Sequence, residues 1–233
     1  MTDNQTLPHL PYFVIDAFTV ADPFTHKPFS GNPAAVCILN EPKTDDWLQQ
    51  VAAELNLSET AFLWHQHENQ WKLRWFTPTC EVKLCGHATL ASAHVLAREL
   101  KLPHAEFSFS TLSGILTAEV DEQTITLSFP KVEPKLFSRI YLHSDNVGIK
   151  ELNLDIVAAY QAGEDIIVEL AYEDEVLNYS PELDKLAKIE TRGIILTAPS
   201  KNADRDFVSR FFAPRFGINE DPVTGSAHCS LAN

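Results

Sequence analysis

Residues 86–97 have the sequence GHATLASAHVLA, which is small and apolar on nearly every side. A helix on a protein surface shows a single apolar stripe, whereas a helix that is apolar all round is buried. We therefore predict a buried helix that begins at Gly86 and extends to Leu100. Runs typical of strands stand on both sides of it, among them Tyr12–Phe18, Ala34–Leu39, Thr60–Trp64, Gln70–Phe76 and Glu106–Thr111.

The order of the expected elements indicates an α+β fold. A helix is expected over Thr44–Leu57, because Trp47, Leu48 and Val51 recur at helical spacing. Single helices interrupt the strands without regular βαβ alternation, which favours α+β over a doubly wound sheet. The remaining expected elements are strands over Ile115–Val120, Thr124–Phe129, Asp165–Leu170, Arg192–Thr197 and Phe207–Phe212, a short helix over Pro181–Ile189, and an irregular connection from Pro130 to about Ile149.

Two segments of the chain resemble each other. The first has Phe-Thr-Pro at 76–78, an acidic residue at 81 and Cys-Gly-His-Ala at 85–88. The second has Phe-Ala-Pro at 212–214, acidic residues at 220–221 and Thr-Gly-Ser-Ala at 224–227. The repeat predicts two similar domains, residues 1–129 and 130–233, although chance similarity is the alternative for so short a match.

The composition limits the classes of partner. The 233 residues carry 18 Lys and Arg against 32 Asp and Glu, which gives a net charge of −14. Because phosphates are neutralised by clustered basic residues, we expect no nucleic-acid partner and no attraction to an anionic membrane. Neither a leader peptide nor an apolar run of about 18 residues is found, so we expect a cytoplasmic protein without a membrane span.

Three side chains are candidates for chemistry. Glu59 lies between a helix and an apolar strand, where a carboxyl group can act as a general acid or base; an exposed glutamate at a strand start is the alternative. His87 follows Gly86 at the start of the buried helix and is either a proton-transfer group or a residue without a task. Asp221 precedes a proline and either orients a substrate or caps a turn.

The sequence contains two candidate anion sites, but no motif for a metal or a dinucleotide cofactor. The helix starts at Gly86 and Gly225 are candidate anion sites, because free N–H groups and the helix dipole favour negative charge there; simple turn glycines are the alternative. Cys80, Cys85 and His87 are close in sequence, but their spacing has no matching second pair, so no metal site is expected. Dinucleotide, Walker A and serine-hydrolase motifs are missing from the sequence, so no dinucleotide cofactor is expected.

The motifs around these residues resemble those of the PhzF-like proteins of phenazine biosynthesis. They keep the order of that family over nearly the whole chain, and the sequence is identified as a member of it. The matching segments are Phe-Ser-Gly-Asn-Pro-Ala-Ala-Val at 29–36, Ser-Glu-Thr-Ala-Phe at 58–62, Arg-Trp-Phe-Thr-Pro at 74–78, Leu-Cys-Gly-His-Ala-Thr-Leu-Ala at 84–91 and Glu-Asp-Pro-Val-Thr-Gly-Ser-Ala-His at 220–228.

The resemblance implies a diaminopimelate-epimerase-like fold. Two similar domains would each wrap a β-barrel around a central helix, and the second helix would begin near Ser226. Family members continue past the second Gly-Ser-Ala motif, so the second domain is expected to be truncated at its C-terminal end. The resemblance also suggests a homodimer.

The resemblance further implies a cofactor-independent isomerase that moves a proton on a small carboxylic acid, such as a cyclic one. Glu59 would shuttle the proton, while His87 and Asp221 would position the polar groups of the substrate. The substrate carboxylate would be held by the backbone of Gly86, His87, Gly225 and Ser226.

Two alternative functions remain open. Related racemases and epimerases use two facing cysteines, one in each half of the molecule. Cys85 stands at the first such position, but the second holds Thr224, which cannot form a thiolate. An amino-acid racemase or epimerase is therefore the weaker alternative, and Cys85 is interpreted as a small buried residue. The other alternative is a non-catalytic protein that binds a small molecule.

Overall fold

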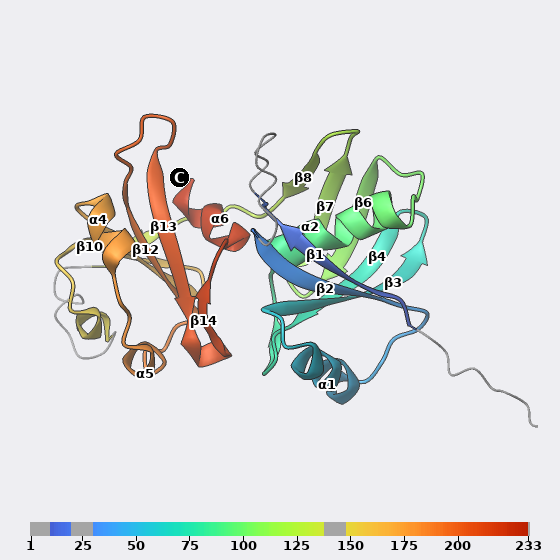
Figure 1. Ribbon diagram of the computed structural model, residues 1–233, viewed down its shortest axis with the longest axis horizontal. Coiled ribbons are helices and arrows are strands. Elements are labelled where there is room, and N and C mark those ends of the chain that lie inside the picture. Colours follow the sequence, from blue (N-terminus) through green and yellow to red (C-terminus); the bar gives the residue numbers. More distant parts are fainter. Residues whose placement is uncertain (1–9, 20–29, 138–147, 233) are drawn as a thin grey trace, which may run out of the picture. The chain divides into compact units, whose positions relative to one another are not determined.

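The computed structural model, shown in Figure 1, describes residues 10–19, 30–137 and 148–232. The chain divides into two compact units, residues 1–128 and 129–233, which we name unit 1 and unit 2. Each contains one mixed sheet together with helices, so the predicted α+β class is confirmed.

The sheet of unit 1 contains β1 (Tyr12–Ala17), β2 (Asn32–Leu39), β3 (Glu59–His67), β4 (Gln70–Phe76), β5 (Glu81–Val82), β6 (Glu106–Thr111), β7 (Gly114–Val120) and β8 (Ile125–Ser128). The strand order is β1-β2-β3-β4-β6-β7-β8, with β5 paired to β4. The pairs β2–β3 and β4–β6 are parallel, and the others are antiparallel. Helix α1 (Asp45–Leu55) connects β2 to β3, and its N-cap Thr44 accepts a hydrogen bond from the N–H of Trp47.

Helix α2 (Gly86–His94) is the centre of unit 1, and Figure 1 shows it lying across the strands. Seven of its nine residues are buried, which confirms the predicted central helix. It contacts β1, β2 and β3 at one end of the strand order and β7 and β8 at the other, so the sheet curls around it. The predicted continuation to Leu100 forms a π-helix, η1 (Val95–Glu99), after which the N–H of Leu100 donates to the carbonyl of Val95.

The sheet of unit 2 contains β9 (Lys135–Leu136), β10 (Ile156–Ala162), β11 (Asp165–Leu170), β12 (Gly193–Pro199), β13 (Phe207–Ala213) and β14 (Ile218–Asp221). The strand order is β14-β13-β12-β11-β10-β9, and only the pair β11–β12 is parallel among these described strands. The helical segments are η2 (Ile149–Leu152), α4 (Glu173–Asn178), α5 (Leu183–Leu186), η3 (Pro214–Phe216), η4 (Gly225–Ala227) and α6 (His228–Leu231).

Both faces of the unit 2 sheet are packed. Since side chains alternate along a strand, Val168 of β11 and Ile167 beside it point to opposite faces. Val168 packs in a cluster with Val176 of α4, whereas Ile167 packs with Ala227 at the start of the last helical segment. The predicted second helix therefore begins where expected, as a 3₁₀ turn over Gly225–Ala227 that leads into α6.

The internal repeat is present in the strand topology. In unit 1, β1–β2 is antiparallel, β2–β3 is parallel with a helix between, β3–β4 is antiparallel, and β5 pairs with β4. Unit 2 repeats this series with β10, β11, β12, β13 and β14. Thr60 faces Phe76 in one unit, and Ile194 faces Phe212 in the other. These registers make Glu59 and Gly193 equivalent positions, and the shared topology favours a duplicated unit over chance similarity.

Several expected boundaries differ from the structure. Strand β10 and helix α4 were not predicted, and the helix expected over Pro181–Ile189 shortens to α5. The irregular connection expected from Pro130 contains the short strand β9, and its residues 138–147 lie outside the described part of the chain. Among the described helices, none is long and apolar enough to cross a membrane.

Candidate active site

One edge of the unit 1 sheet gathers the candidate residues. Because β2 and β3 are parallel, their first residues lie at the same edge, where Asn32 begins β2 and Glu59 begins β3. Ser58 directly precedes β3. Helix α2 also begins at this edge, with Cys85 as its N-cap residue and His87 in its first turn. Local strand and helix starts thus bring together residues that are distant in sequence.

A ring of hydrogen bonds holds the imidazole of His87. Nδ2 of Asn32 lies 3.2 Å from Nδ1 of His87, and Oγ of Ser58 lies 3.3 Å from Nε2. The Ser58 hydroxyl donates to Oδ1 of Asn32 at 3.1 Å, which fixes the orientation of the amide. An amide nitrogen can only donate, so Nδ1 of His87 accepts and the proton of the neutral ring is on Nε2.

Glu59 faces that protonated nitrogen. Its Oε2 lies 3.4 Å from Nε2 of His87, and the two residues are 7% and 2% exposed. The alternative of an exposed glutamate at a strand start is therefore wrong. A buried carboxyl beside an imidazole N–H is an arrangement suited to moving protons.

Burial keeps the imidazole neutral. It lowers the pKa of His87 from its ordinary value of 6.5 to about 4, and a hydrogen bond to the backbone of Pro33 opposes this only in part. A neutral ring can donate one proton and accept another at the same time, which a charged ring cannot.

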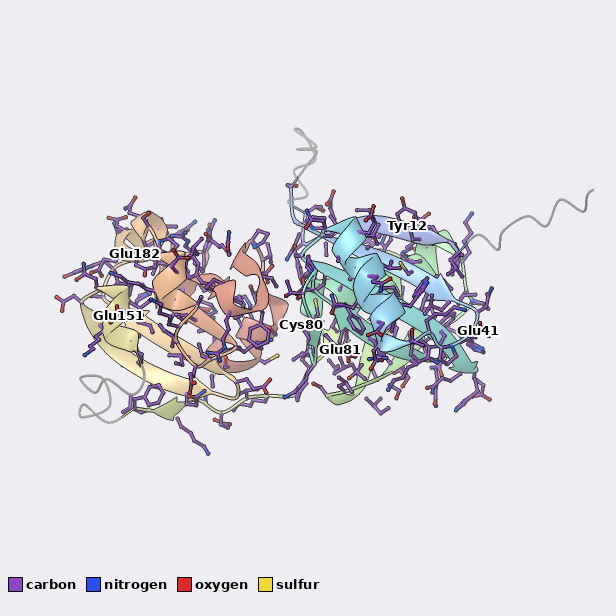
Figure 2. The ribbon with its side chains drawn as sticks, turned by 90° about the horizontal axis from the view of Figure 1, so that it is seen from below. Tyr12, Glu41, Cys80, Glu81, Glu151 and Glu182 are labelled. Carbon is purple, nitrogen blue, oxygen red and sulfur yellow. The ribbon has the colours of Figure 1, made fainter. Side chains whose placement is uncertain are left out.

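Cys85 is buried, as expected, but it is also part of the cluster: its Sγ lies 3.5 Å from Nδ1 of His87. Among the described residues, donor atoms of Glu59, Cys85 and His87 lie within 4.8 Å of one another. Cys80 is outside this group. It lies beside Glu81, as Figure 2 shows, and its Sγ is 3.6 Å from Oγ1 of Thr77. Although Cys80 and Cys85 are close in sequence, Cys80 therefore does not belong to the cluster of Glu59, Cys85 and His87.

In unit 2, Asp221 ends β14 and is buried. Its Oδ2 accepts a hydrogen bond of 2.6 Å from the hydroxyl of Thr224. A contact of this kind is what the interpretation of Asp221 as a turn cap predicts. The same hydrogen bond occupies the hydroxyl of Thr224, which stands where a racemase has its second cysteine. Gly225 and Ser226 follow at the start of η4.

Ser226 has a charged neighbour that the sequence did not reveal. Nη2 of Arg192 donates to its Oγ at 3.3 Å, while the guanidinium forms a bidentate pair with buried Asp165. The strand registers make Arg192 the equivalent of Ser58, since each directly precedes one of the equivalent residues Gly193 and Glu59. The internal repeat was the signal that could have pointed to it.

Unit 1 thus combines a curled mixed sheet with a buried carboxyl group and a buried imidazole that lie close together. The family model of phenazine biosynthesis-like proteins, PhzC-PhzF, matches residues 21–233. An uncharacterized isomerase from Halalkalibacterium halodurans is 47% identical over 225 residues, which cover 95% of this chain and 80% of that protein. A crystal structure of a PhzF family protein from Enterococcus faecalis aligns with a TM-score of 0.78 at 37% identity, covering 96% of this chain and 80% of that one.

The chain therefore belongs to the PhzC/PhzF family of phenazine biosynthesis-like proteins, and the predicted enzyme class, an isomerase, is confirmed. A predicted epimerase from Pseudomonas aeruginosa, 18% identical, aligns with a TM-score of 0.63 over 93% of this chain and 77% of that one. At this identity the likeness concerns the fold alone, and it agrees with the expected epimerase-like architecture.

Proposed function

We propose that the protein moves a proton between positions of a small carboxylic acid, with Glu59 as the single acid and base. The observation that carries this proposal is the contact between the buried carboxyl of Glu59 and the Nε2–H of neutral His87. A carboxylate that takes a proton from carbon becomes a neutral acid and returns that proton to another position, and a nearby donor stabilises its charged form before the first step and after the second.

The remaining candidate residues receive binding roles in this proposal. His87 positions a polar group of the substrate and orients Glu59, and the backbone N–H groups of Gly86 and His87 attract the carboxylate, because a helix N-terminus favours an anion. In unit 2, Asp221 holds a polar group such as an amine. The backbone of Gly225 and Ser226 offers further donors for the carboxylate.

We further propose that the reaction needs no cofactor and that a homodimer carries it out in the cytoplasm. Light scattering coupled to size exclusion tests the dimer, and activity of extensively dialysed protein tests the independence from cofactors. The substrate is to be found by an NMR screen of cyclic and amino-acid carboxylates in D₂O, in which exchange of a carbon-bound proton is the readout.

Glu59→Gln is expected to abolish this exchange while leaving ligand affinity nearly unchanged, because the amide keeps the shape of the side chain and loses its basicity. Glu54→Gln is the matched control, since the same chemical change is made on an exposed residue of α1. Exchange at the wild-type rate in Glu59→Gln would refute the assignment. Deuterium incorporation with inversion at Cα would instead favour the racemase, and binding without any exchange would favour the non-catalytic protein.

A further inference from the structure

The cluster of Glu59, Cys85 and His87 contains three different kinds of metal ligand. We propose that it binds one Zn²⁺ ion, and that this ion inhibits the protein rather than serving as its cofactor. One carboxylate oxygen, one thiol sulfur and one ring nitrogen lie within 4.8 Å of one another, and all three residues are buried. They come from the first residue of β3, the N-cap of α2 and the first turn of α2, so the backbone holds them at three fixed points.

The spacing of two donor atoms already fits a single ion. Tetrahedral zinc with its usual bond lengths separates a sulfur ligand from a nitrogen ligand by about 3.6 Å. Sγ of Cys85 and Nδ1 of His87 are 3.5 Å apart. The ion takes the lone pair of Nδ1 to which Asn32 donates in the metal-free protein, so the amide of Asn32 must release the ring.

The other ring nitrogen keeps its own partner when Nδ1 binds the ion. Metal-binding histidines generally donate their second N–H to a nearby acceptor, which holds the ring in place. Here Nε2 lies 3.3 Å from Oγ of Ser58. Glu59 completes the protein ligands by turning its carboxylate from Nε2 toward the ion, and a water molecule or an anion takes the fourth position.

The types of donor select the metal. A thiolate, an imidazole and a carboxylate suit Zn²⁺ and its spectroscopic substitute Co²⁺, whereas Mg²⁺ and Ca²⁺ prefer oxygen ligands alone. The thiol of Cys85 releases its proton to the solvent when the metal–sulfur bond forms, and the positive end of α2 at Gly86 favours the resulting thiolate. The two negative ligands balance the charge of the ion.

Zn²⁺ should inhibit the protein because Glu59 is both a ligand of the ion and the proposed acid and base. The inhibition, unlike the binding, therefore rests on the proposed function. A carboxylate oxygen that is bound to zinc no longer accepts a proton from carbon. Zn²⁺ should therefore stop the exchange reaction, and a chelator should restore it. The binding itself does not depend on what reaction the protein catalyses.

The test uses the 233-residue chain, freed of metal and titrated with Co²⁺. One equivalent should produce a thiolate-to-cobalt charge-transfer band in the near ultraviolet, which Zn²⁺ then removes by displacement. Cys85→Ser should abolish the band and weaken Zn²⁺ binding at least about 100-fold, since even outer-shell changes cost up to that much. Cys80→Ser is the matched control, and its spectrum and affinity should equal those of the wild type.

The titration of the wild-type protein tests for the metal site even if a variant fails to fold. A wild-type spectrum without the band, or a band that persists in Cys85→Ser, would overturn the metal site. The two proposals can also fail separately. If the band is present but no carboxylate exchanges a proton, the proposed function fails and the site stands. If exchange depends on Glu59 but no band forms, the site alone fails.

Discussion

Two small polar side chains, Asn32 and Ser58, decide which nitrogen of His87 carries the proton. The amide of Asn32 donates to Nδ1 and leaves the proton on Nε2, the nitrogen that faces Glu59. Oε2 of Glu59 thus lies 3.4 Å from a protonated nitrogen and not from a competing lone pair. A buried carboxylate needs such a partner, because an unpaired buried charge is costly.

The buried imidazole of His87 makes stability depend on pH. Its pKa is about 4 in the folded protein against an ordinary value of 6.5, so the unfolded chain binds more protons between these values. The free energy of unfolding is therefore at its full value above the higher pKa and decreases as the pH falls toward the lower one. From pH 7 to pH 5 the loss is about 2 kcal/mol.

His87→Gln should remove this part of the pH dependence, as measured by urea unfolding at the two pH values in the presence of a chelator. His67→Gln alters an exposed histidine of the same unit and serves as the control. An equal loss of stability in wild type and His87→Gln would show that other groups cause the dependence.

The sequence pointed to Glu59, His87 and Asp221 through motifs, but it did not show the role of Asn32 or Ser58. Both lie within the segments that resemble the family, at 29–36 and 58–62, and their types are common in turns. Their task depends on the parallel register of β2 and β3, and register is a long-range property that a local pattern does not contain. The assignments of the candidate site residues stay predictions until the variants are measured.

At the scale of the element, each unit contains the same clasp between an arginine and a glutamate. Arg74 of β4 forms a bidentate pair with Glu81 of β5, and its guanidinium lies over the ring of Phe76 at 5.1 Å. Arg210 of β13 pairs in the same way with Glu220 of β14, and lies 4.9 Å from the ring of Phe212. Each clasp fixes the short strand that leads to the glycine and the helix start.

Replacing either clasp arginine by lysine should lower the free energy of unfolding by about 1–2 kcal/mol, because a lysine cannot form two parallel hydrogen bonds. Denaturant unfolding of Arg74→Lys and Arg210→Lys measures this. Lys185→Ala, which removes an exposed pair with Glu182, should change stability by less than about 1 kcal/mol. A clasp variant as stable as this control would show that the bidentate geometry contributes nothing.

Gly193 at the start of β12 leaves room for an aromatic ring. A Cβ placed there would lie 2.1 Å from the ring of Phe211, which is far inside any real contact. Phe211 packs in the cluster beneath the last helical segment of unit 2. Because its ring is held there, its close approach to position 193 requires a glycine. Any larger residue must displace the ring or the strand.

Gly193→Ala should therefore destabilise the protein by about 1–3 kcal/mol, the usual cost of overpacking. The double variant Gly193→Ala/Phe211→Leu should lose less than the two single changes added together, because the smaller side chain removes the clash. Urea unfolding of the four proteins measures the coupling. Strict additivity would mean that the ring is not what excludes a side chain at this position.

At the scale of the whole molecule, equivalent positions in the two units carry different chemistry. Glu59 in unit 1 corresponds to Gly193 in unit 2, and Ser58 corresponds to Arg192. The contact of Ser58 with His87 thus has a counterpart in the contact of Arg192 with Ser226. We expect proton transfer to be confined to unit 1, while unit 2 places the ion pair of Arg192 and Asp165 beside Ser226.

Much of this fold follows from the sequence, because strongly patterned segments such as α2 and β4 depend on local physics. The strands β5, β10 and β14 have weak patterns and could be placed only from the structure. The strands β11 and β12 were predicted, but their parallel pairing over a long connection was not. The π-helix at the end of α2 was also beyond prediction. A pattern of small, apolar residues is compatible with both the α-helical and the π-helical spacing of backbone hydrogen bonds.

The parallel pairing of β2 with β3 bears on the order of events as the chain folds. Parallel strands cannot be joined by a tight turn, and pairings over long separations form slowly. Asn32 and Ser58 are 26 positions apart, and Asn32 and His87 are 55 apart. A refolding chain should therefore regain its helices before its buried acid–imidazole pair.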